Sequence, residues 1–216
     1  MADKLAVYNQ VLLALGKREL SSLREHRPER ARIDTLWASG LRYCLAKGQW
    51  IFATRTVEAT ADAEVPAIGY AKAFRKPVDW VRTLAIATDA RFAMPLNEYA
   101  DEQDFWFADV EPLYLRYLSD SDEFGLNLAL WTSSFERYVI AHFVADLYVP
   151  FQLQDGQTAS PQALLALKRE ERERLREAES ENAMNKPAAF PPPGRWLQAR
   201  FGGRARSVSR WDGTTR

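Results

Sequence analysis

The sequence predicts an α+β protein, mainly α: a helical bundle with an inserted block of short antiparallel β-strands and an extended C-terminal tail. Three observations carry this prediction. Residues 1–50 and 119–183 repeat apolar side chains at helical spacing. Residues 51–118 hold short runs of β-forming residues separated by Asp, Pro and Gly. Residues 184–216 follow neither period, so we expect three parts: a helical bundle, a β-rich insertion and a basic tail.

Two helices are expected at the start of the chain. The first begins after Asp3, a residue type that caps helices, and ends at Gly16, which suits a left-handed stop. Its apolar face is made by Leu5, Tyr8, Val11, Leu12 and Leu15. The second has Pro28 near its first turn and ends at Gly48. Its stripe of apolar and small residues is Ile33, Leu36, Trp37, Gly40, Leu41, Cys44 and Leu45. Within this stripe, Gly40 is expected to permit the close approach of another backbone.

The middle of the chain is expected to form roughly four to six short strands. The β-forming runs occupy residues 50–59, 80–89, 90–96, 103–108 and 111–120. In the last run the two alternating faces differ only weakly in polarity. We therefore expect that strand to be covered on both sides of its sheet.

Two further helices are expected after the strands. The first opens with Ser133 and Glu136, the spacing of a capping box, and is apolar nearly all round up to Pro150, so it is expected to be the central buried helix. The second has Ser160 as its cap and Pro161 in its first turn. Leucines 164, 165 and 167 fill its first half and charges fill its second half. Its i, i+4 pairs both attract (Glu170–Arg174) and repel (Arg172–Arg176), so we expect it either to project or to lie against another surface.

Charge is distributed unevenly along the chain. The whole sequence has 29 basic and 29 acidic residues. The tail from Lys186 to Arg216 holds seven basic residues and one acid, Asp212, so the remainder keeps 22 basic and 28 acidic residues. The body is therefore about −6 and the tail about +6 at neutral pH. Such a tail suits either a nucleic acid or the acidic body of a neighbouring copy.

Several classes of protein are excluded by composition. Cys44 is the single cysteine, which rules out an intrachain disulfide and a cysteine-based zinc site. Because Cys44 lies on an apolar stripe, we interpret it as a small core residue rather than a nucleophile. No apolar run is long enough to span a bilayer, and the first residues lack the pattern of a signal peptide. We expect no membrane association and folding in a reducing cytoplasm.

No catalytic constellation is evident in the sequence, and none of the common nucleotide, hydrolase or metalloprotease motifs is present. His142 and Asp146 stand one helical turn apart, which suits an acid–base or ligand pair, but a partly buried imidazole satisfied by a carboxylate is the favoured interpretation. His26 reads as a solvated loop residue. The acidic runs at 97–104 and 119–123 read as turns rather than cation sites, because the calcium-loop pattern is absent. We expect no enzymatic activity, no cofactor and no metal.

The tail holds the candidate binding residues, in which cations alternate with aromatic and apolar side chains. They are Phe190, Arg195, Trp196, Leu197, Arg200, Phe201, Arg204, Arg206, Arg210 and Trp211. Single-stranded nucleic acid is bound by such mixtures through phosphate pairing and base stacking. Arg and Trp are equally typical of anchors in protein interfaces. Plain disorder is disfavoured, because large apolar groups in such a segment require a partner surface.

Several motifs, taken in order, resemble the head-to-tail adaptor family of tailed bacteriophages, which includes the tail tubular protein A type. The likeness begins with the helix, turn and Leu-closed loop of residues 9–23 and continues with Gly48, Trp50 and Phe52. Pro77, Asp79 and Arg82 match the family's Pro-x-Asp-x-x-Arg pattern at the start of a strand. Residues 113–151 match its strand, acidic turn and long apolar helix. The family usually has Leu before that proline, where this chain has Lys76, so the resemblance implies no role for this position.

The resemblance covers about residues 5–155 and implies a structural virion protein. Such adaptors form a ring, commonly of twelve copies, that docks under the portal protein after DNA packaging and presents a platform to the next tail component, a nozzle or tube protein. Packaged DNA passes through the channel without sequence-specific binding. The implied location is the head–tail junction of a virion assembled in the host cytoplasm. The tail residues are then expected to bind portal or a neighbouring subunit, and a nucleic-acid-binding protein is the alternative.

Overall fold

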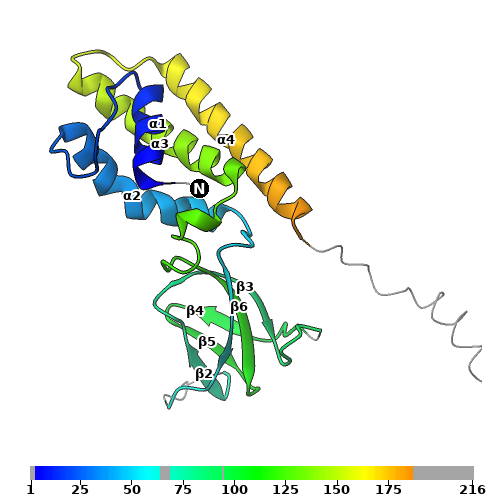
Figure 1. The fold of residues 1–216 in the computed structure, drawn as a ribbon. Coiled ribbons are helices and arrows are strands. Elements are labelled where there is room, and N and C mark those ends of the chain that lie inside the picture. Colours follow the sequence, from blue (N-terminus) through cyan, green and yellow to red (C-terminus); the bar gives the residue numbers. More distant parts are fainter. Residues whose placement is uncertain (1–2, 64–68, 94, 187–216) are drawn as a thin grey trace, which may run out of the picture. The chain divides into compact units, whose positions relative to one another are not determined.

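The computed structural model describes residues 3–63, 69–93 and 95–186. The chain divides into two units, Met1–Asn185 and Lys186–Arg216, and residues 187–216 of the predicted extended tail lie outside the described residues. The helices are α1 (Lys4–Ala14), α2 (Pro28–Lys47), α3 (Ser133–Gln154) and α4 (Pro161–Met184), with a short 3-10 turn at Leu128–Leu130. The strands are β1 (Thr54–Ala59), β2 (Lys72–Arg75), β3 (Trp80–Ala87), β4 (Ala100–Glu102), β5 (Phe105–Ala108) and β6 (Leu113–Ser119). The fold is therefore α+β and mainly α, as predicted (Figure 1).

Helix α1 ends in the glycine turn that the sequence indicates, but it does not begin with the expected cap. Gly16 has φ +69°, and its N–H donates to Leu13 O at 3.0 Å while that of Lys17 donates to Leu12 O at 2.8 Å. These two bonds satisfy carbonyls that the helix end would leave unpaired. Asp3 occupies the N-cap position, but its side chain makes no capping hydrogen bond.

Helix α2 follows its predicted bounds, with Pro28 in the first turn and Gly48 at the C-cap. Gly40 was expected to permit the close approach of another backbone, and this prediction is wrong. A Cβ at this position would lie 2.9 Å from the Phe143 Cζ atom, so a ring of α3 rather than a backbone occupies the space. Phe143 also stacks on Trp37 of α2, with ring centroids 5.5 Å apart. The missing side chain of Gly40 therefore admits an aromatic ring between the two helices.

The caps of the last two helices are only partly as predicted. In α3 the cap is Thr132, whose hydroxyl accepts from the Phe135 N–H, and Ser133 is already the first helical residue. The predicted capping box of Ser133 and Glu136 is therefore not formed, because the N3 residue after Thr132 is Phe135. In α4 Ser160 is the cap, and its hydroxyl accepts from the Ala163 N–H. Both side chains satisfy N–H groups that have no partner within the helix.

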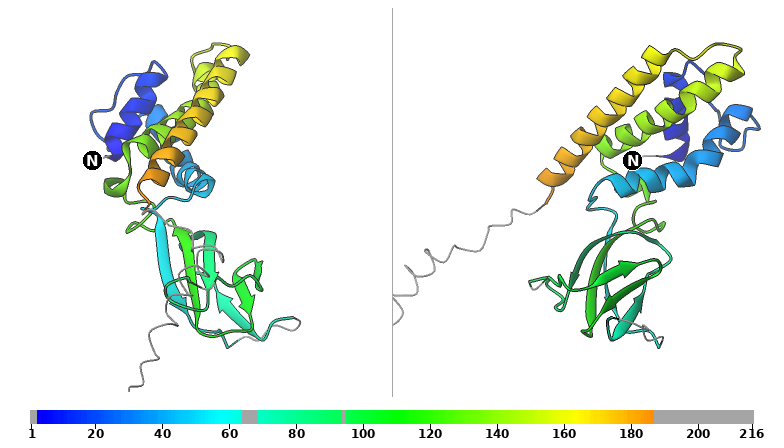
Figure 2. Two further views of the ribbon diagram at one scale, coloured as in Figure 1. Left: turned by 90° about the vertical axis from the view of Figure 1, so that its right-hand side faces the viewer. Right: turned by 180° about the vertical axis from the view of Figure 1, so that it is seen from behind.

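Helix α3 is the central helix, as predicted, but it does not stop at Pro150. It contacts each of the other three helices (Figure 2). It continues through Pro150 to Gln154, because Phe151 is fully packed in the core and holds the last turn in place. The Pro150 carbonyl accepts a hydrogen bond from Arg32 of α2. Tertiary packing thus overrides the tendency of proline to end a helix.

Helix α4 lies along α3, which settles the two alternatives left open by its sequence. Leu167 and Leu175 pack against the core and Ala178 is fully buried, whereas Leu165 is 69% exposed. Most of its charged side chains are exposed, whereas Glu171 is half-buried. The expected attraction between Glu170 and Arg174 is present, with 3.6 Å between the charged groups.

The strands form two three-stranded antiparallel sheets, with orders β1-β6-β3 and β2-β5-β4. Strand β6 is central in its sheet; Leu113, Leu115 and Tyr117 are buried, while Tyr114 on the other face is half-buried. Strands β2 and β4 were not expected, and the run 90–96 forms no named strand. It contributes a single bridge between Ala87 and Pro95.

Two hydrophobic clusters underlie these elements. The first joins the four helices around Trp50 and includes Leu118 at the end of β6. The second lies among the strands around Trp106 and takes residues from four of them, including Phe74 of β2 and Ile86 of β3. Strand β6 contributes to both, because Leu113 and Leu115 belong to the second cluster. The strand block is thus packed both internally and against the helices.

Candidate functional site

The residues predicted to bind a partner, from Phe190 to Trp211, all lie outside the described residues. The functional geometry that the structure provides is in the body. It comprises a joint where the helices meet the strand block, two polar clusters at the start of β3, a buried histidine, and a groove on the helical bundle.

The joint is centred on the C-terminal end of α2, where side chains from outside the helix reach several of the last carbonyls. The Trp50 indole N–H donates to the Cys44 and Leu45 carbonyls at 3.2 and 3.1 Å. Arg82 of β3 donates to the Ala46 carbonyl at 3.1 Å and to the Gly48 carbonyl at 2.7 Å. Helix ends leave these carbonyls without intrahelical partners, so the strand block completes the helix.

Asn182 ties helix α4 to the same joint. Its buried side chain accepts from the Ile51 N–H at 2.9 Å and donates to the Gln49 carbonyl at 2.8 Å. Gly48 is required beside it, because a Cβ there would lie 2.4 Å from the Trp50 ring. The spacing of Gly48 and Trp50 in the sequence therefore has a steric cause. Asn182 has no recognisable sequence signal, because its partners are 131 and 133 residues away.

A second arginine strengthens the joint from α2. Arg42 donates to the Trp80 carbonyl at 2.7 Å and pairs with Asp120 at 2.6 Å. Burial raises the pKa of the Asp120 carboxyl, and Arg42 partly offsets that rise. The acidic run 119–123 thus supplies a structural partner through Asp120.

Asp79 organises the start of β3. Its carboxylate accepts from Ser119 at 2.5 Å, Arg55 at 2.9 Å and Tyr117 at 3.2 Å. Burial would raise the pKa of Asp79, but these hydrogen bonds outweigh it and hold the pKa below its usual value. Burial and the Asp79 charge raise the pKa of Tyr117 to about 12. The cluster therefore connects β1, β3 and β6 through one ionised carboxylate.

Lys76 is enclosed just before this segment. Its side chain is 6% exposed, lies 4.1 Å from the Trp80 ring centroid, and donates to the Gln103 carbonyl at 2.6 Å. It pairs with Asp101 at 2.5 Å. Burial acts to raise the pKa of Asp101, but its bonds from Lys76, Thr83 and Trp106 lower it below the ordinary value. At the position for which the resemblance implies no role, the enclosed Lys76 side chain therefore packs against aromatic rings and pairs with the partly exposed Asp101.

The buried histidine has a closer partner than the sequence suggests. His142 is 6% exposed, and its Nδ1 lies 2.8 Å from Glu171 Oε1 of α4. Asp146, the predicted partner, is more distant, at 3.6 Å from Nε2. The imidazole also stacks on Tyr43 of α2, with centroids 4.7 Å apart. His142 thus links three helices. Glu171 could not be predicted as its partner from the sequence, because the two residues are 29 positions apart.

The environments of Cys44 and His26 agree with the structural roles predicted for them. Cys44 is fully buried, and burial raises the pKa of its thiol, which disfavours the reactive thiolate. His26 is exposed in the loop before α2, as expected. Within residues 3–63, 69–93 and 95–186, no group of three or more His, Cys, Asp or Glu side chains is placed to hold a metal ion.

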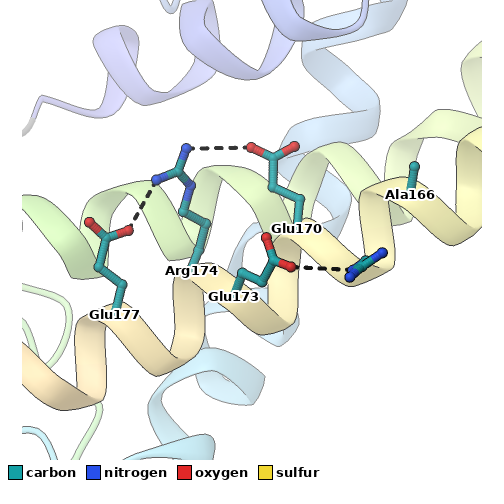
Figure 3. A pocket seen from close by; sticks show the side chains of 6 residues that line it. Ala166, Glu170, Glu173, Arg174 and Glu177 are labelled. Atoms are coloured by element: carbon teal, nitrogen blue, oxygen red, sulfur yellow. Dashed lines mark hydrogen bonds and ion pairs between the residues drawn. The ribbon is translucent and has the colours of Figure 1, made fainter.

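The helical bundle carries a groove above α3, between α1 and α4. Two adjoining hollows share Ala14, Leu167 and Glu170, so they form one continuous depression. The α3 residues that line it are Arg137, Ile140, Ala141, Val144, Tyr148 and Gln152. A third hollow continues it over the outer face of α4. There Arg174 pairs with Glu170 and Glu177 (Figure 3).

A scan against protein-family models and a search of curated proteins both found no match to this chain. No helix in the described part of the chain combines the length and apolar character needed to cross a membrane.

Proposed function

We propose that this protein is a head-to-tail adaptor of a tailed bacteriophage. In this role it forms an oligomeric ring that joins the capsid portal to the tail and continues the DNA channel. It is a structural component of the virion and performs no reaction. Its partners are the portal protein, the downstream nozzle or tube protein, and other copies of itself.

The joint is the observation that carries this proposal. The resemblance depends on two separate motifs, the one at Gly48 and Trp50 and the one that ends in Arg82. In the folded chain these motifs complete the same helix end, because Trp50 and Arg82 bind successive carbonyls of α2. If the two motifs matched the family by chance, they would have no reason to meet in the fold. Their residues instead bind the same helix end, which supports the proposal.

The tail is proposed as the tether of this assembly. It carries about +6 against a body of about −6, and it holds Trp196, Phe201 and Trp211. Burial of these three side chains on a partner contributes several kcal/mol before the cost of ordering the segment. Portal and a neighbouring adaptor subunit are the two candidate partners.

Negative-stain electron microscopy of the protein mixed with candidate portal rings tests the proposal. We expect the full chain to add a ring of density to the portal. A chain lacking residues 187–216 is expected to fold, because both hydrophobic clusters lie in the body, but to leave the portal bare. A chain in which a Gly/Ser segment of equal length replaces the tail is the matched control for length. Portal particles decorated equally by all three chains would refute the tether, and undecorated particles with the full chain would refute the adaptor.

Nucleic-acid binding by the tail is the alternative, favoured by the alternation of arginines with aromatic residues from Arg195 to Trp211. It predicts an affinity for single-stranded DNA that falls steeply as salt rises. A gel-shift titration of the isolated protein distinguishes the two functions. Tight binding with a steep salt slope would favour the alternative, since the acidic body repels DNA elsewhere.

A further inference from the structure

The groove between α1 and α4 has the form of a receptor for bulky side chains. Its lining is rich in small residues, among them Ala14 of α1, Ala141 of α3 and Ala166 of α4. Ile140, Val144 and Leu167 add apolar surface to it. A hollow lined by small apolar side chains gains contacts when a large ring enters it.

Charged groups of α3 and α4 border this groove: Arg137 and Arg174 are basic, and each pairs with a glutamate of α4. Glu170 lines all three hollows, and 54% of its side chain is exposed although it pairs with Arg174. A carboxylate has about four acceptor sites, so it can bind a second guanidinium at the same time. An occupant with bulky apolar groups flanked by arginines therefore fits both the lining and the rim.

We propose that the segment from Arg195 to Phe201 of a second copy binds in this groove. Trp196 and Phe201 would fill the apolar lining, with the flanking arginines beside Glu170. The opposite net charges of the tail and the body favour the same pairing. This inference rests on the proposed function, because a ring brings neighbouring copies of the chain into contact.

The dimensions agree with this occupant. The α3 lining runs from Arg137 to Gln152, which is about 22 Å along a helix. Trp196 and Phe201 are separated by five residues, which span about 17 Å when extended and about 8 Å when helical. The groove is long enough to receive both anchors in either conformation.

Disulfide trapping between two full-length chains tests the assignment. One chain carries Ala166→Cys in the groove and the other carries Gln198→Cys between the two anchors. The native Cys44 is fully buried, so the added thiols are the reactive ones. The control replaces the first chain by one with Ala38→Cys, an exposed residue of α2 outside the groove lining. Docking raises the local thiol concentration, so we expect the groove pair to cross-link at least about tenfold faster than the control pair.

A further variant of the tail chain, with Trp196→Ala and Phe201→Ala beside Gln198→Cys, is expected to lose this advantage. Equal rates for the groove and control pairs would overturn the assignment. A double variant that carries both cysteines in one chain tests binding within the same chain. If this variant forms an internal disulfide at high dilution while the mixed single variants stay unlinked, the assignment is also overturned. No portal is present in these mixtures, so a negative result leaves the adaptor proposal to its own test.

Discussion

Lys76 and Asp79 stand three residues apart and head two separate polar clusters at the start of β3. The Asp79 carboxylate binds residues of β1 and β6, whereas Lys76 pairs with Asp101 of β4. Both carboxylates in these clusters have a lowered pKa despite burial, because their donors favour the charged form. Each cluster therefore makes a distinct prediction at the scale of one residue.

Asp79→Asn is expected to destabilise the protein by about 1–3 kcal/mol at neutral pH, because Arg55 loses its ionised acceptor. A carboxyl whose folded pKa is depressed stabilises the fold above its unfolded pKa of about 3.9, and this contribution is lost as pH falls through the folded value. The difference from wild type should therefore shrink at acid pH. Urea unfolding at several pH values measures it. Glu102→Gln, on an exposed side chain, is the control, and a difference independent of pH would contradict the prediction.

Lys76→Met is expected to lower the free energy of unfolding by about 1–3 kcal/mol, because it leaves the Asp101 carboxylate without its cation. The loss is smaller than for a fully buried pair, since the Asp101 side chain is 32% exposed. In a chain that already carries Asp101→Asn, the same change should cost clearly less. The four unfolding free energies form a double-mutant cycle that isolates the pair. Additive losses would show that the lysine acts through Trp80 or the Gln103 carbonyl rather than through Asp101.

At the scale of elements, Gly40 sets how closely α2 and α3 approach. Gly40→Ala would normally stabilise a helix by about 1 kcal/mol. Here its Cβ would lie 2.9 and 3.0 Å from two atoms of the Phe143 ring, so we expect a net loss of about 1–3 kcal/mol. Ser39→Ala, one residue earlier on an exposed position, is the control and should change stability by less than about 0.5 kcal/mol. Thermal unfolding followed by circular dichroism compares them, and a more stable Gly40→Ala chain would refute the expected clash.

Arg82 couples two elements by completing the end of α2. Arg82→Met is expected to lower the unfolding free energy by about 2 kcal/mol, because two carbonyls lose a charged donor. Arg82→Lys should recover only part of this, since an ammonium cannot present the same planar fork. Urea unfolding followed by tryptophan fluorescence provides the measurement. Arg91→Met, on an exposed loop residue, is the control, and an equal loss there would disprove a specific role for the joint.

Elements whose ends are set by neighbouring residues were predictable, and those that depend on distant partners were not. Gly16, Pro28 and Ser160 mark helix ends through local backbone chemistry, and the sequence located them correctly. The short strands β2 and β4 have little pattern of their own, since they are defined by pairing with β5. Helix α3 continued past Pro150 because the packing of Phe151 outweighed a local stop signal.

The same distinction holds for the candidate site as a whole. Trp50 and Arg82 were singled out in the sequence, but their common target became apparent only when the chain folded, because the carbonyls they bind carry no sequence signal. Glu171 and Asn182 are unremarkable members of a charged helix until α4 packs on the bundle. The tail residues were identified by composition alone.

Charge asymmetry makes the last prediction, for the whole molecule. If each basic tail binds the acidic body of another copy, the full chain should self-associate at low ionic strength. A chain ending at Asn185 keeps a net charge of about −6, so its copies repel and it should stay monomeric. Sedimentation velocity at about 50 mM and about 500 mM salt tests this, because screening weakens the attraction between exposed charges.

The tail's two contributions can be separated in the same measurement. Replacing Arg204, Arg206 and Arg210 by Gln removes half of the tail's net charge and leaves Trp196 and Phe201 in place. We expect this variant to associate more weakly at low salt and to show a flatter salt dependence, because the remaining attraction comes from apolar burial. Association of the truncated chain to the same extent as the full chain would contradict the model, since the contact would then lie between bodies and the tail would have another partner.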